Sequence, residues 1–272
     1  MELSTKEYKQ GLSKRESFLI SSLAREDKTI FDIEDAKKII EENAKKTMYS
    51  LIQKKWVLPL RRGLYVIVPL DVGVKGADSF ILHNFVIASF LAKPYYIGFW
   101  SALNHYGFSD QIPRTTFVAT IHIIKPLDIL NSTYYFVKLV KKKFLGIKKI
   151  KIDEEKINIS NPDKTIVDCL DHPEYCGGID EIARAIYFSH QELNFQRIKE
   201  YSVRMNNVTI LKRLGYILDK TNLLRGYENT FKGLKLSRGY PLLDPFSFKK
   251  GKYDTRWNLL INYRINIEGW MH

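Results

Sequence analysis

The chain has 272 residues, of which 45% are hydrophobic, so it can bury a substantial core and is not intrinsically disordered. Its formal net charge of +13 favours an anionic partner, either nucleic acid or an acidic membrane surface. The absence of any run of about 18 apolar residues argues against a membrane-spanning helix, and two cysteines make no disulfide framework, so we expect a cytoplasmic protein.

Periodicity in the first 70 residues predicts three helices followed by a β-hairpin. Ser13 with Glu16 is a capping-box pattern, and Asp32 and Asn43 are suitable N-caps for the second and third helices. Gly63 permits the positive φ that a tight turn requires. The expected helices span about 14–26, 33–41 and 44–55, and the expected strands about 56–60 and 64–68. This order indicates a winged helix-turn-helix in residues 1–70.

Residues 71–78 contain two glycines and two aspartates, and we interpret them as a linker. The remaining residues, 79–272, alternate between helical and strand-like patterns. We expect helices at about 79–93, 99–106, 162–170, 179–189, 194–205 and 207–219, and strands at about 115–124, 133–140, 146–152, 156–160, 240–246 and 256–265. The predicted fold class is therefore α+β, with an N-terminal winged helix-turn-helix followed by a larger mixed α+β domain.

The third helix has one apolar side, formed by Ala44, Met48, Leu51 and Ile52, and one polar side. The polar side carries Lys46, Tyr49, Ser50 and Gln53, with Lys45 beside them. Two lysines in the first turn oppose the helix dipole, which favours acids there. A phosphate or a guanine edge would explain them, and the glutamine is suited to pair with adenine. We therefore predict that this helix reads DNA.

The charge pattern of the following hairpin agrees with this prediction. Residues 43–70 contain no acid, and their cations are Lys45, Lys46, Lys54, Lys55, Arg61 and Arg62. Arg61 and Arg62 at the hairpin tip are placed to enter a minor groove or to contact the phosphate backbone. We include Lys54 in the predicted DNA-binding face. The structural alternative is a solvated basic surface on a domain that binds protein.

A second basic segment extends from residue 138 to residue 151 and also lacks acids. Its candidate nucleic-acid contacts are Lys141, Lys142, Lys143, Lys148 and Lys149. We expect the three consecutive lysines to form a loop between two strands, where they would either grip a phosphate backbone or only keep an exposed hairpin soluble.

Enzyme and metal patterns are weak, so we expect no enzymatic activity, cofactor or metal site. Asp128, Glu154 and Lys156 loosely resemble the carboxylate–lysine layout of metal-dependent nucleases. Cys169, His172 and Cys176 lie close together in the sequence but have no obvious fourth ligand for a structural zinc ion. A nuclease remains one alternative function, and an RNA-binding or protein-binding module is another.

Four segments resemble the AbiEi family, the antitoxins and regulators of type IV toxin–antitoxin abortive-infection systems. They are Arg61–Tyr65, Tyr96–Gly107, Ile159–Asp168 and Arg213–Leu218, and they occur in the family's order within a resemblance that covers about 14–265. Lys164 stands where the family often has arginine. The segment 138–151 and the chain from about Lys249 onward do not match the family pattern.

The resemblance implies a transcriptional repressor of its own operon that binds operator repeats in double-stranded DNA. It also implies that the second domain antagonises a genetically linked nucleotidyltransferase toxin without a stable complex. The residues carried over are Lys45, Lys46, Tyr49, Ser50, Gln53, Arg61 and Arg62. In the segment around Ser101, Asn104 and His105, helix packing is the more economical interpretation, as it is for Thr165–Asp168.

Overall fold

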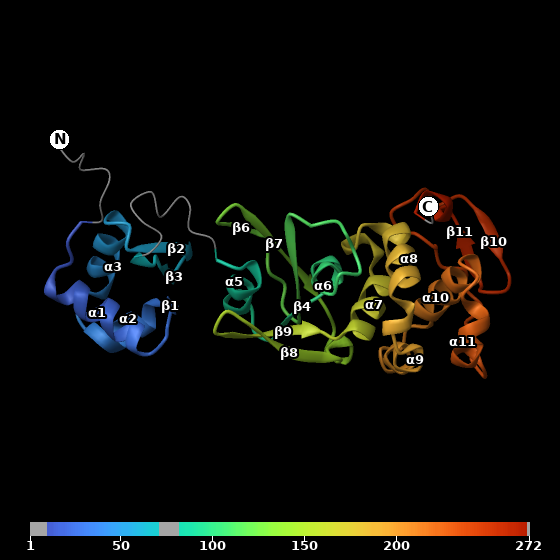
Figure 1. Cartoon of the computed structure of the whole chain (residues 1–272), viewed down its shortest axis with the longest axis horizontal. Coiled ribbons are helices and arrows are strands. Elements are labelled where there is room, and N and C mark those ends of the chain that lie inside the picture. The colour runs from blue at the N-terminus through green and yellow to red at the C-terminus, as the bar shows by residue number, and fades with distance from the viewer. Residues whose placement is uncertain (1–9, 71–81, 271–272) are drawn as a thin grey trace. The chain divides into compact units, whose positions relative to one another are not determined.

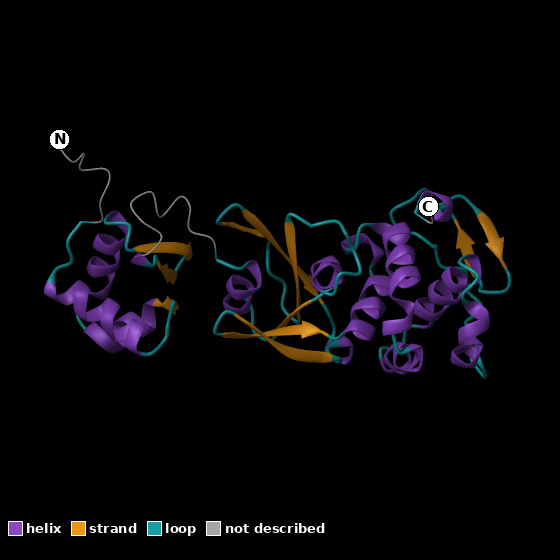
Figure 2. Ribbon diagram, viewed as in Figure 1, coloured by secondary structure: helices purple, strands orange, loops and turns teal. Residues whose placement is uncertain are grey.

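The computed structural model describes residues 10–70 and 82–270, and the predicted linker 71–78 lies outside these residues. The chain divides into two compact units, Met1–His83 with Ile129–Asn131, and Asn84–Asp128 with Ser132–His272. Both units combine helices with β-sheet, so the mixed α+β class predicted from the sequence is correct (Figure 2).

The first unit consists of three helices and a small antiparallel sheet (Figure 1). Its elements are α1 Lys14–Arg25, β1 Ile30–Asp32, α2 Ile33–Ile40, α3 Ala44–Gln53, β2 Val57–Arg61 and β3 Leu64–Ile67. The sheet order is β1-β3-β2, so β3 is the central strand. The sequence did not predict β1, because three residues are too few to show alternation.

Local sequence explains why α1 and α2 begin where they do. Ser13 and Glu16 form the predicted capping box, in which the Ser13 backbone N–H donates to Glu16 Oε2 at 2.6 Å. Asp32 caps α2 in the same way together with Asp35. The apolar sides of the three helices then meet in one core with β1, formed by Leu19, Leu23, Phe31, Ala36, Ile40, Ala44, Met48, Leu51 and Val57.

The second unit begins with α5, Asn84–Leu91, which is shorter than the helix predicted for 79–93. Residues 82 and 83 are not helical, and the proposed start of that helix lies outside the described residues. A mixed sheet of six strands follows, in the order β6-β7-β5-β4-β9-β8. Its strands are β4 Tyr95–Ile97, β5 Thr115–Thr120, β6 Leu127–Ile129, β7 Ser132–Lys138, β8 Ile147–Ile152 and β9 Glu155–Ser160. β4 pairs parallel with β9 and antiparallel with β5, so it holds the two halves of the sheet together.

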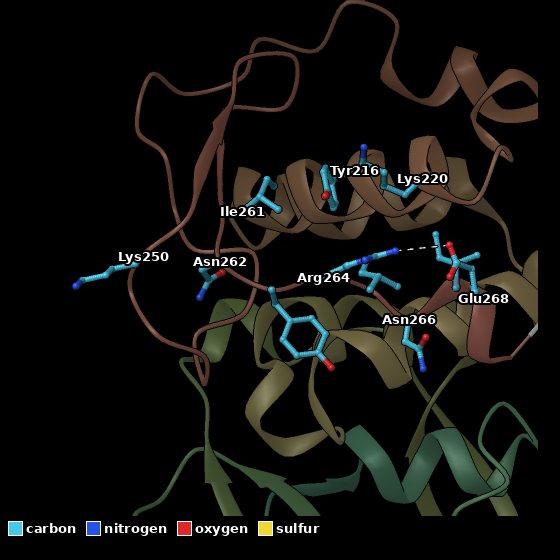
Figure 3. A pocket seen from close by; sticks show the side chains of 11 residues that line it. Tyr216, Lys220, Lys250, Ile261, Asn262, Arg264, Asn266 and Glu268 are labelled. Atoms are coloured by element: carbon cyan, nitrogen blue, oxygen red, sulfur yellow. Dashed lines mark ion pairs between the residues drawn. The ribbon is translucent and has the colours of Figure 1, made fainter.

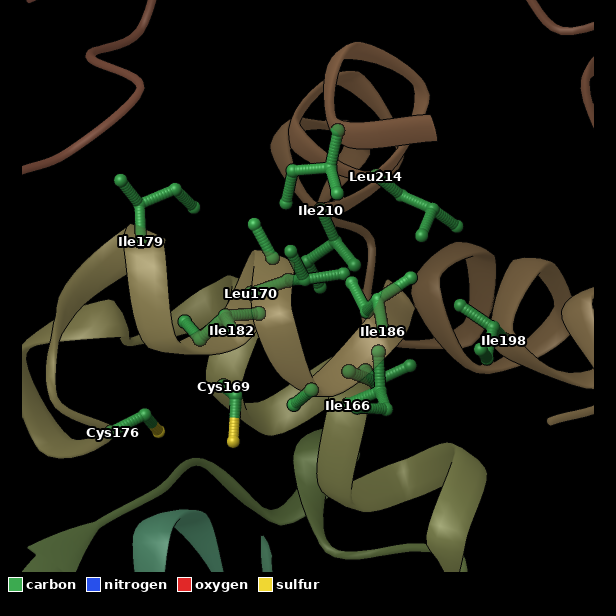
Figure 4. Close-up of a cluster of buried hydrophobic side chains, with 14 of the residues drawn as sticks. Ile166, Cys169, Leu170, Cys176, Ile179, Ile182, Ile186, Ile198, Ile210 and Leu214 are labelled. Carbon is green, nitrogen blue, oxygen red and sulfur yellow. The ribbon is translucent and has the colours of Figure 1, made fainter. Parts of the chain in front are cut away.

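Helix α6, Phe99–His105, packs against β5 and α7, and most of the other helices lie beyond the sheet (Figure 1). They are α7 Pro162–Asp171, α8 Gly178–Ser189, α9 Phe195–Arg204, α10 Val208–Lys220 and α11 Leu224–Phe231, the last of which was not predicted. Asn161 caps α7 as predicted, with Pro162 at the first helical position. Residues 163–170 of α7 are all buried, which makes this helix the centre of the unit. Ile166, Cys169 and Leu170 of α7 lie among side chains of α8, α9 and α10 (Figure 4).

The C-terminal part of the unit contains a short hairpin of β10, Lys252–Asp254, and β11, Leu259–Ile261. The strand predicted for 240–246 is wrong, since only Leu242 forms a bridge, with Leu260. Pro241 and Pro245 lack backbone N–H groups, which limits the pairing of this segment. In the part of the chain that the structure describes, no helix has the length and apolar character needed to cross a membrane.

Candidate nucleic-acid interface

The third helix of the first unit, α3, packs its apolar side into the core, so its polar side faces solvent. Ala44, Met48 and Leu51 are buried against α1, α2 and the sheet. On the opposite side, Lys45, Lys46, Tyr49 and Gln53 are exposed. Tyr49 is the clearest case, since 67% of its surface is accessible although tyrosine usually buries most of its ring.

The start of α3 differs from the other helix starts in this unit. Asn43 occupies the N-cap position as predicted, but it adopts a left-handed conformation with φ of 58° and its side chain makes no cap hydrogen bond. The first turn holds no acid and carries Lys45 and Lys46. Backbone N–H groups at such a helix start point outward and attract anions. The lysines and these N–H groups therefore form one electropositive end.

Two predicted contact residues, Ser50 and Lys54, are half-buried and interact with Glu16. Lys54 Nζ lies 2.7 Å from Glu16 Oε2 and also donates to the Gly11 carbonyl oxygen at 3.0 Å. Ser50 also hydrogen-bonds to the Glu16 carboxylate. Burial alone would raise the pKa of Glu16, but the hydrogen bonds from Lys54, Ser50 and Ser13 outweigh it and lower the pKa to about 2. Both side chains thus join the end of α3 to the start of α1 through Glu16.

The hairpin of β2 and β3 places two arginines at its tip. Gly63 has a φ of 80°, which allows the tight connection that the sequence predicts. The register shifts between Pro59 and Arg61, so that Arg61 pairs with Leu64. The bulge turns the end of β2, and both Arg61 and Arg62 are exposed. Residues 43–70 contain no acid, and their exposed cations lie on α3, directly after it and at this tip, while other exposed cations of the unit lie on α1 and α2.

Lys143 and Lys148 of the second basic segment, 138–151, interact with other side chains of the protein, which the sequence does not suggest. Lys141–Lys143 form a short 3-10 helix rather than an open loop. Lys143 is only 18% exposed and its Nζ lies 2.5 Å from Asp171 Oδ2. Lys148 Nζ lies 4.7 Å from the centre of the Tyr106 ring. Lys141, Lys142, Lys148 and Lys149 are exposed. β8 is an edge strand, and lysines there also keep other strands from pairing with it.

The residues of the nuclease pattern are not brought together. Asp128 lies on β6 and Glu154 lies in the turn after β8, at opposite edges of the six-stranded sheet. Asp128 Oδ1 accepts a hydrogen bond from Thr133 Oγ1 at 2.7 Å, and Glu154 pairs with Lys151 at 2.8 Å. Two carboxylates so far apart cannot share a metal ion, so this arrangement does not form the site that the pattern suggests.

Cys169, His172 and Cys176 do not form a metal centre either. Cys176 Sγ donates to the His172 carbonyl oxygen at 3.6 Å, and the His172 ring lies beside Glu174 at 2.9 Å. Burial raises the pKa of both thiols, which disfavours the thiolate that binds metal. Among the described residues, no group of three or more His, Cys, Asp and Glu side chains is arranged to hold an ion.

The structure reveals a buried polar cluster that sequence reasoning assigned only to packing. Lys164 and Asp168, both 0% exposed, form an ion pair within α7, and Tyr96 from β4 hydrogen-bonds to both at 3.0 Å and 2.9 Å. Burial raises the pKa of Asp168 against the opposing effect of Lys164. The spacing of four residues between Lys164 and Asp168 was the available signal. Because the cluster is closed to solvent, we interpret it as structural.

The segment around α6 is likewise mostly structural. Ser101 is buried and accepts a hydrogen bond from the Phe117 backbone N–H at 2.8 Å. Asn104 donates to the Gln111 carbonyl oxygen at 3.1 Å, while His105 is exposed and its ring lies 5.1 Å from that of Tyr106. The packing interpretation therefore fits Ser101 and Asn104.

Comparison with known proteins identifies a similar fold but no family. No protein-family model matches the chain, and no curated protein matches it. The crystal structure of the RV2827C protein from Mycobacterium tuberculosis is similar, with a TM-score of 0.67 and 14% sequence identity over 95% of each chain. At this identity the likeness concerns the fold alone.

Proposed function

We propose that the chain is a sequence-specific DNA-binding repressor of its own operon and the antitoxin to a nucleotidyltransferase toxin. In this proposal the first unit is a winged helix-turn-helix, with α2 and α3 as the helix pair, α3 as the recognition helix and the β2–β3 hairpin as the wing. The repressor acts in the cytoplasm on double-stranded operator DNA and needs no cofactor.

One observation carries the DNA-binding half of this proposal. Lys45, Lys46, Tyr49 and Gln53 are exposed on α3, directly opposite its buried apolar side. Lysines in a first helical turn cost about 0.3–1 kcal/mol against the helix dipole, so they do not serve stability. A DNA major groove offers phosphates and guanine edges to lysine and an adenine edge to glutamine. Without an anionic ligand, two lysines in the first turn would only lower the stability of this helix.

The wing supplies the second part of the proposed interface. Arg61 and Arg62 are exposed at the tip, and residues 43–70 contain no acid that would repel a phosphate. Arginine at such a tip fits a narrow minor groove or the phosphate backbone. We therefore assign sequence reading to α3 and anchoring to the wing.

The test is a comparison of two duplexes of equal length and composition, the DNA upstream of the protein's own gene and a scrambled version. We expect tighter binding to the upstream duplex and a steep loss of affinity with added salt. Lys46→Ala and Gln53→Ala should reduce the preference for the upstream duplex, each by about tenfold. Lys37→Ala is the matched control, because Lys37 lies exposed on α2 and pairs with Glu34. Equal affinity for both duplexes would refute the proposal.

The antitoxin half rests on the resemblance of four segments to the AbiEi family, and it has its own test. The full chain should restore growth when it is expressed with the neighbouring nucleotidyltransferase, without a stable complex between them. Lys46→Ala should lose repression yet still restore growth, since the second unit would carry the antitoxin activity. Failure of the unmodified chain to restore growth would remove this half and leave DNA binding unaffected.

A further inference from the structure

A positively charged hollow lies in the second unit, far along the chain from α3. It has a volume of about 750 Å³ and is lined by residues from α10, β11 and the segments around 250 and 264–268. Three of its lining side chains are cations, Lys220, Lys250 and Arg264, and one is an acid, Glu268. Figure 3 shows Tyr216 and Lys220 on one helix and Arg264 directed toward Glu268, while Lys250 lies on a separate loop and points away from them.

The cations of this hollow are only weakly neutralised by the protein itself. Arg264 and Glu268 are 3.5 Å apart, and both side chains are at least 85% exposed, so solvent screens the pair. Lys220 Nζ lies 5.5 Å from the centre of the Tyr216 ring. Within residues 10–70 and 82–270, no ion pair involves Lys250. The hollow therefore favours an anion.

The segment beside the hollow increases this positive charge. Residues 232–256 contain seven lysines and arginines but only two acids, Asp244 and Asp254. Asp244 is buried and accepts hydrogen bonds from the Phe246 N–H and the Ser247 hydroxyl. Asp254 accepts one from the Trp257 N–H. Both carboxylates keep their negative charge, and Arg256 pairs with Asp219 at 2.9 Å, so the segment adds a smaller excess of positive charge than the residue count suggests.

The same segment exposes aromatic rings among its cations. Phe246, Phe248 and Tyr253 are 74%, 90% and 69% exposed. Phe248 is held at the edge of the hollow, because its carbonyl oxygen accepts from the Asn262 side chain at 3.1 Å and Asn262 lines the hollow. Tyr253 pairs with Leu260, so its side chain lies on the face of the hairpin opposite to that of Ile261, and its ring packs against the Tyr240 ring with the centres 5.0 Å apart. Phe246 lines a separate hollow, so Phe248 is the exposed ring at the edge of this cationic one, and such a ring indicates a binding surface.

We infer that this C-terminal aromatic–basic surface, made of Lys220, Lys250, Arg264 and Phe248, binds single-stranded nucleic acid. Phosphates would occupy the hollow, and an unpaired base would stack on Phe248. A duplex fits less well, since its bases already stack on one another. A membrane fits less well too, since a flat array of headgroups does not enter a hollow. This activity is separate from the operator binding proposed for the first unit.

The experiment measures fluorescence anisotropy of a labelled single strand of about 20 nucleotides, as RNA and as DNA, with the full chain. All proteins carry Lys46→Ala, Arg61→Ala and Arg62→Ala, which remove the proposed operator interface. We expect Phe248→Ala and Lys250→Ala each to weaken binding by about tenfold. Phe18→Ala and Arg204→Ala are matched controls, because these exposed residues lie outside the surface, and they should change affinity by less than about twofold.

The outcomes separate this inference from its rivals. Binding of either single strand that is lost in Phe248→Ala and Lys250→Ala supports the surface, and the preferred strand identifies RNA or DNA. Binding that all four variants share equally would overturn it. The inference would also be overturned, in favour of a membrane partner, if the protein bound neither single strand but bound vesicles of anionic phospholipid and lost this binding in Phe248→Ala. Failure of the operator experiment would leave this result unchanged.

Discussion

Lys54 Nζ lies 2.7 Å from Glu16 Oε2, so an ion pair joins the end of α3 to the start of α1. Glu16 also belongs to the capping box that begins α1. One carboxylate therefore fixes both the start of the first helix and the position of the helix that we propose to read DNA.

Replacing Lys54 with methionine should lower stability without directly removing a DNA contact. The substitution leaves the buried Glu16 carboxylate without its cation, which we expect to cost about 1–3 kcal/mol in the free energy of unfolding. Operator affinity of the folded variant should stay within about threefold of the unmodified chain. Denaturant unfolding and anisotropy measure the two effects. The exposed neighbour Lys55→Met is the control and should leave stability nearly unchanged. A variant of full stability and weak DNA binding would restore the original sequence interpretation of Lys54.

The stability of the first unit should depend on acid through Glu16. Its pKa falls from an ordinary value of 4.5 to about 2, so the folded unit binds fewer protons than the unfolded chain between these values. The contribution is fully present above pH 4.5 and is lost as the pH falls toward 2. Glu16→Gln should therefore be less stable than the unmodified chain at neutral pH, and the difference should shrink through this window. The measurement is denaturant unfolding at several pH values, with the exposed Glu42→Gln as control. A difference that is the same at pH 3 and pH 7 would contradict the assignment.

The two arginines at the hairpin tip should affect the salt dependence of DNA binding. If each neutralises one phosphate, Arg61→Ala and Arg62→Ala should each reduce the slope of log affinity against log salt by about 1. They should weaken binding to the upstream and scrambled duplexes alike, because phosphates carry no sequence. Lys46→Ala, in contrast, should change the ratio between the duplexes. Anisotropy at about 50 to 200 mM salt distinguishes these cases. An unchanged slope in the double arginine variant would remove the wing from the interface.

Removing one partner of the buried Lys164–Asp168 pair should lower stability more than replacing both partners with apolar residues. Lys164→Met leaves Asp168 and the Tyr96 hydroxyl without their cation in the core, which we expect to cost about 3–5 kcal/mol in stability. Lys164→Met with Asp168→Leu removes both charges and should recover part of this loss. Thermal unfolding of the second unit measures both variants. A double variant that is less stable than Lys164→Met would show that the pair itself contributes net stability.

Most helices could be predicted because their signals are local. The Ser13–Glu16 capping box, the Asn161-Pro162 start and the apolar spacing of α3 each involve residues within one or two turns. Short strands gave no such signal. β1 and β4 each have three residues and exist because a partner strand supplies their hydrogen bonds. Asn43 shows the same limit, since it is a suitable cap by residue type yet lies in a left-handed conformation.

The sequence predicted which residues lie on the polar side of α3, but it did not predict which of their side chains interact with other parts of the protein. Helical spacing alone places Ser50 near Lys46 and Gln53, and lysine at position 54 adds to the positive charge. Only the packing of α1 against α3 shows that Ser50 and Lys54 are held by Glu16. The same holds for Lys143, whose charge is used by Asp171 from a distant helix.

By itself the sequence determined the order of most elements, the apolar sides that pack and the stretch without acids in residues 43–70. These follow from local spacing and from the kind of residue present. The tertiary structure decided which cations face solvent, which carboxylates lie at opposite sheet edges, and that Lys220, Lys250 and Arg264 line one hollow. Those facts depend on residues far apart in the chain, and only the burial of shared apolar surface brings such residues together.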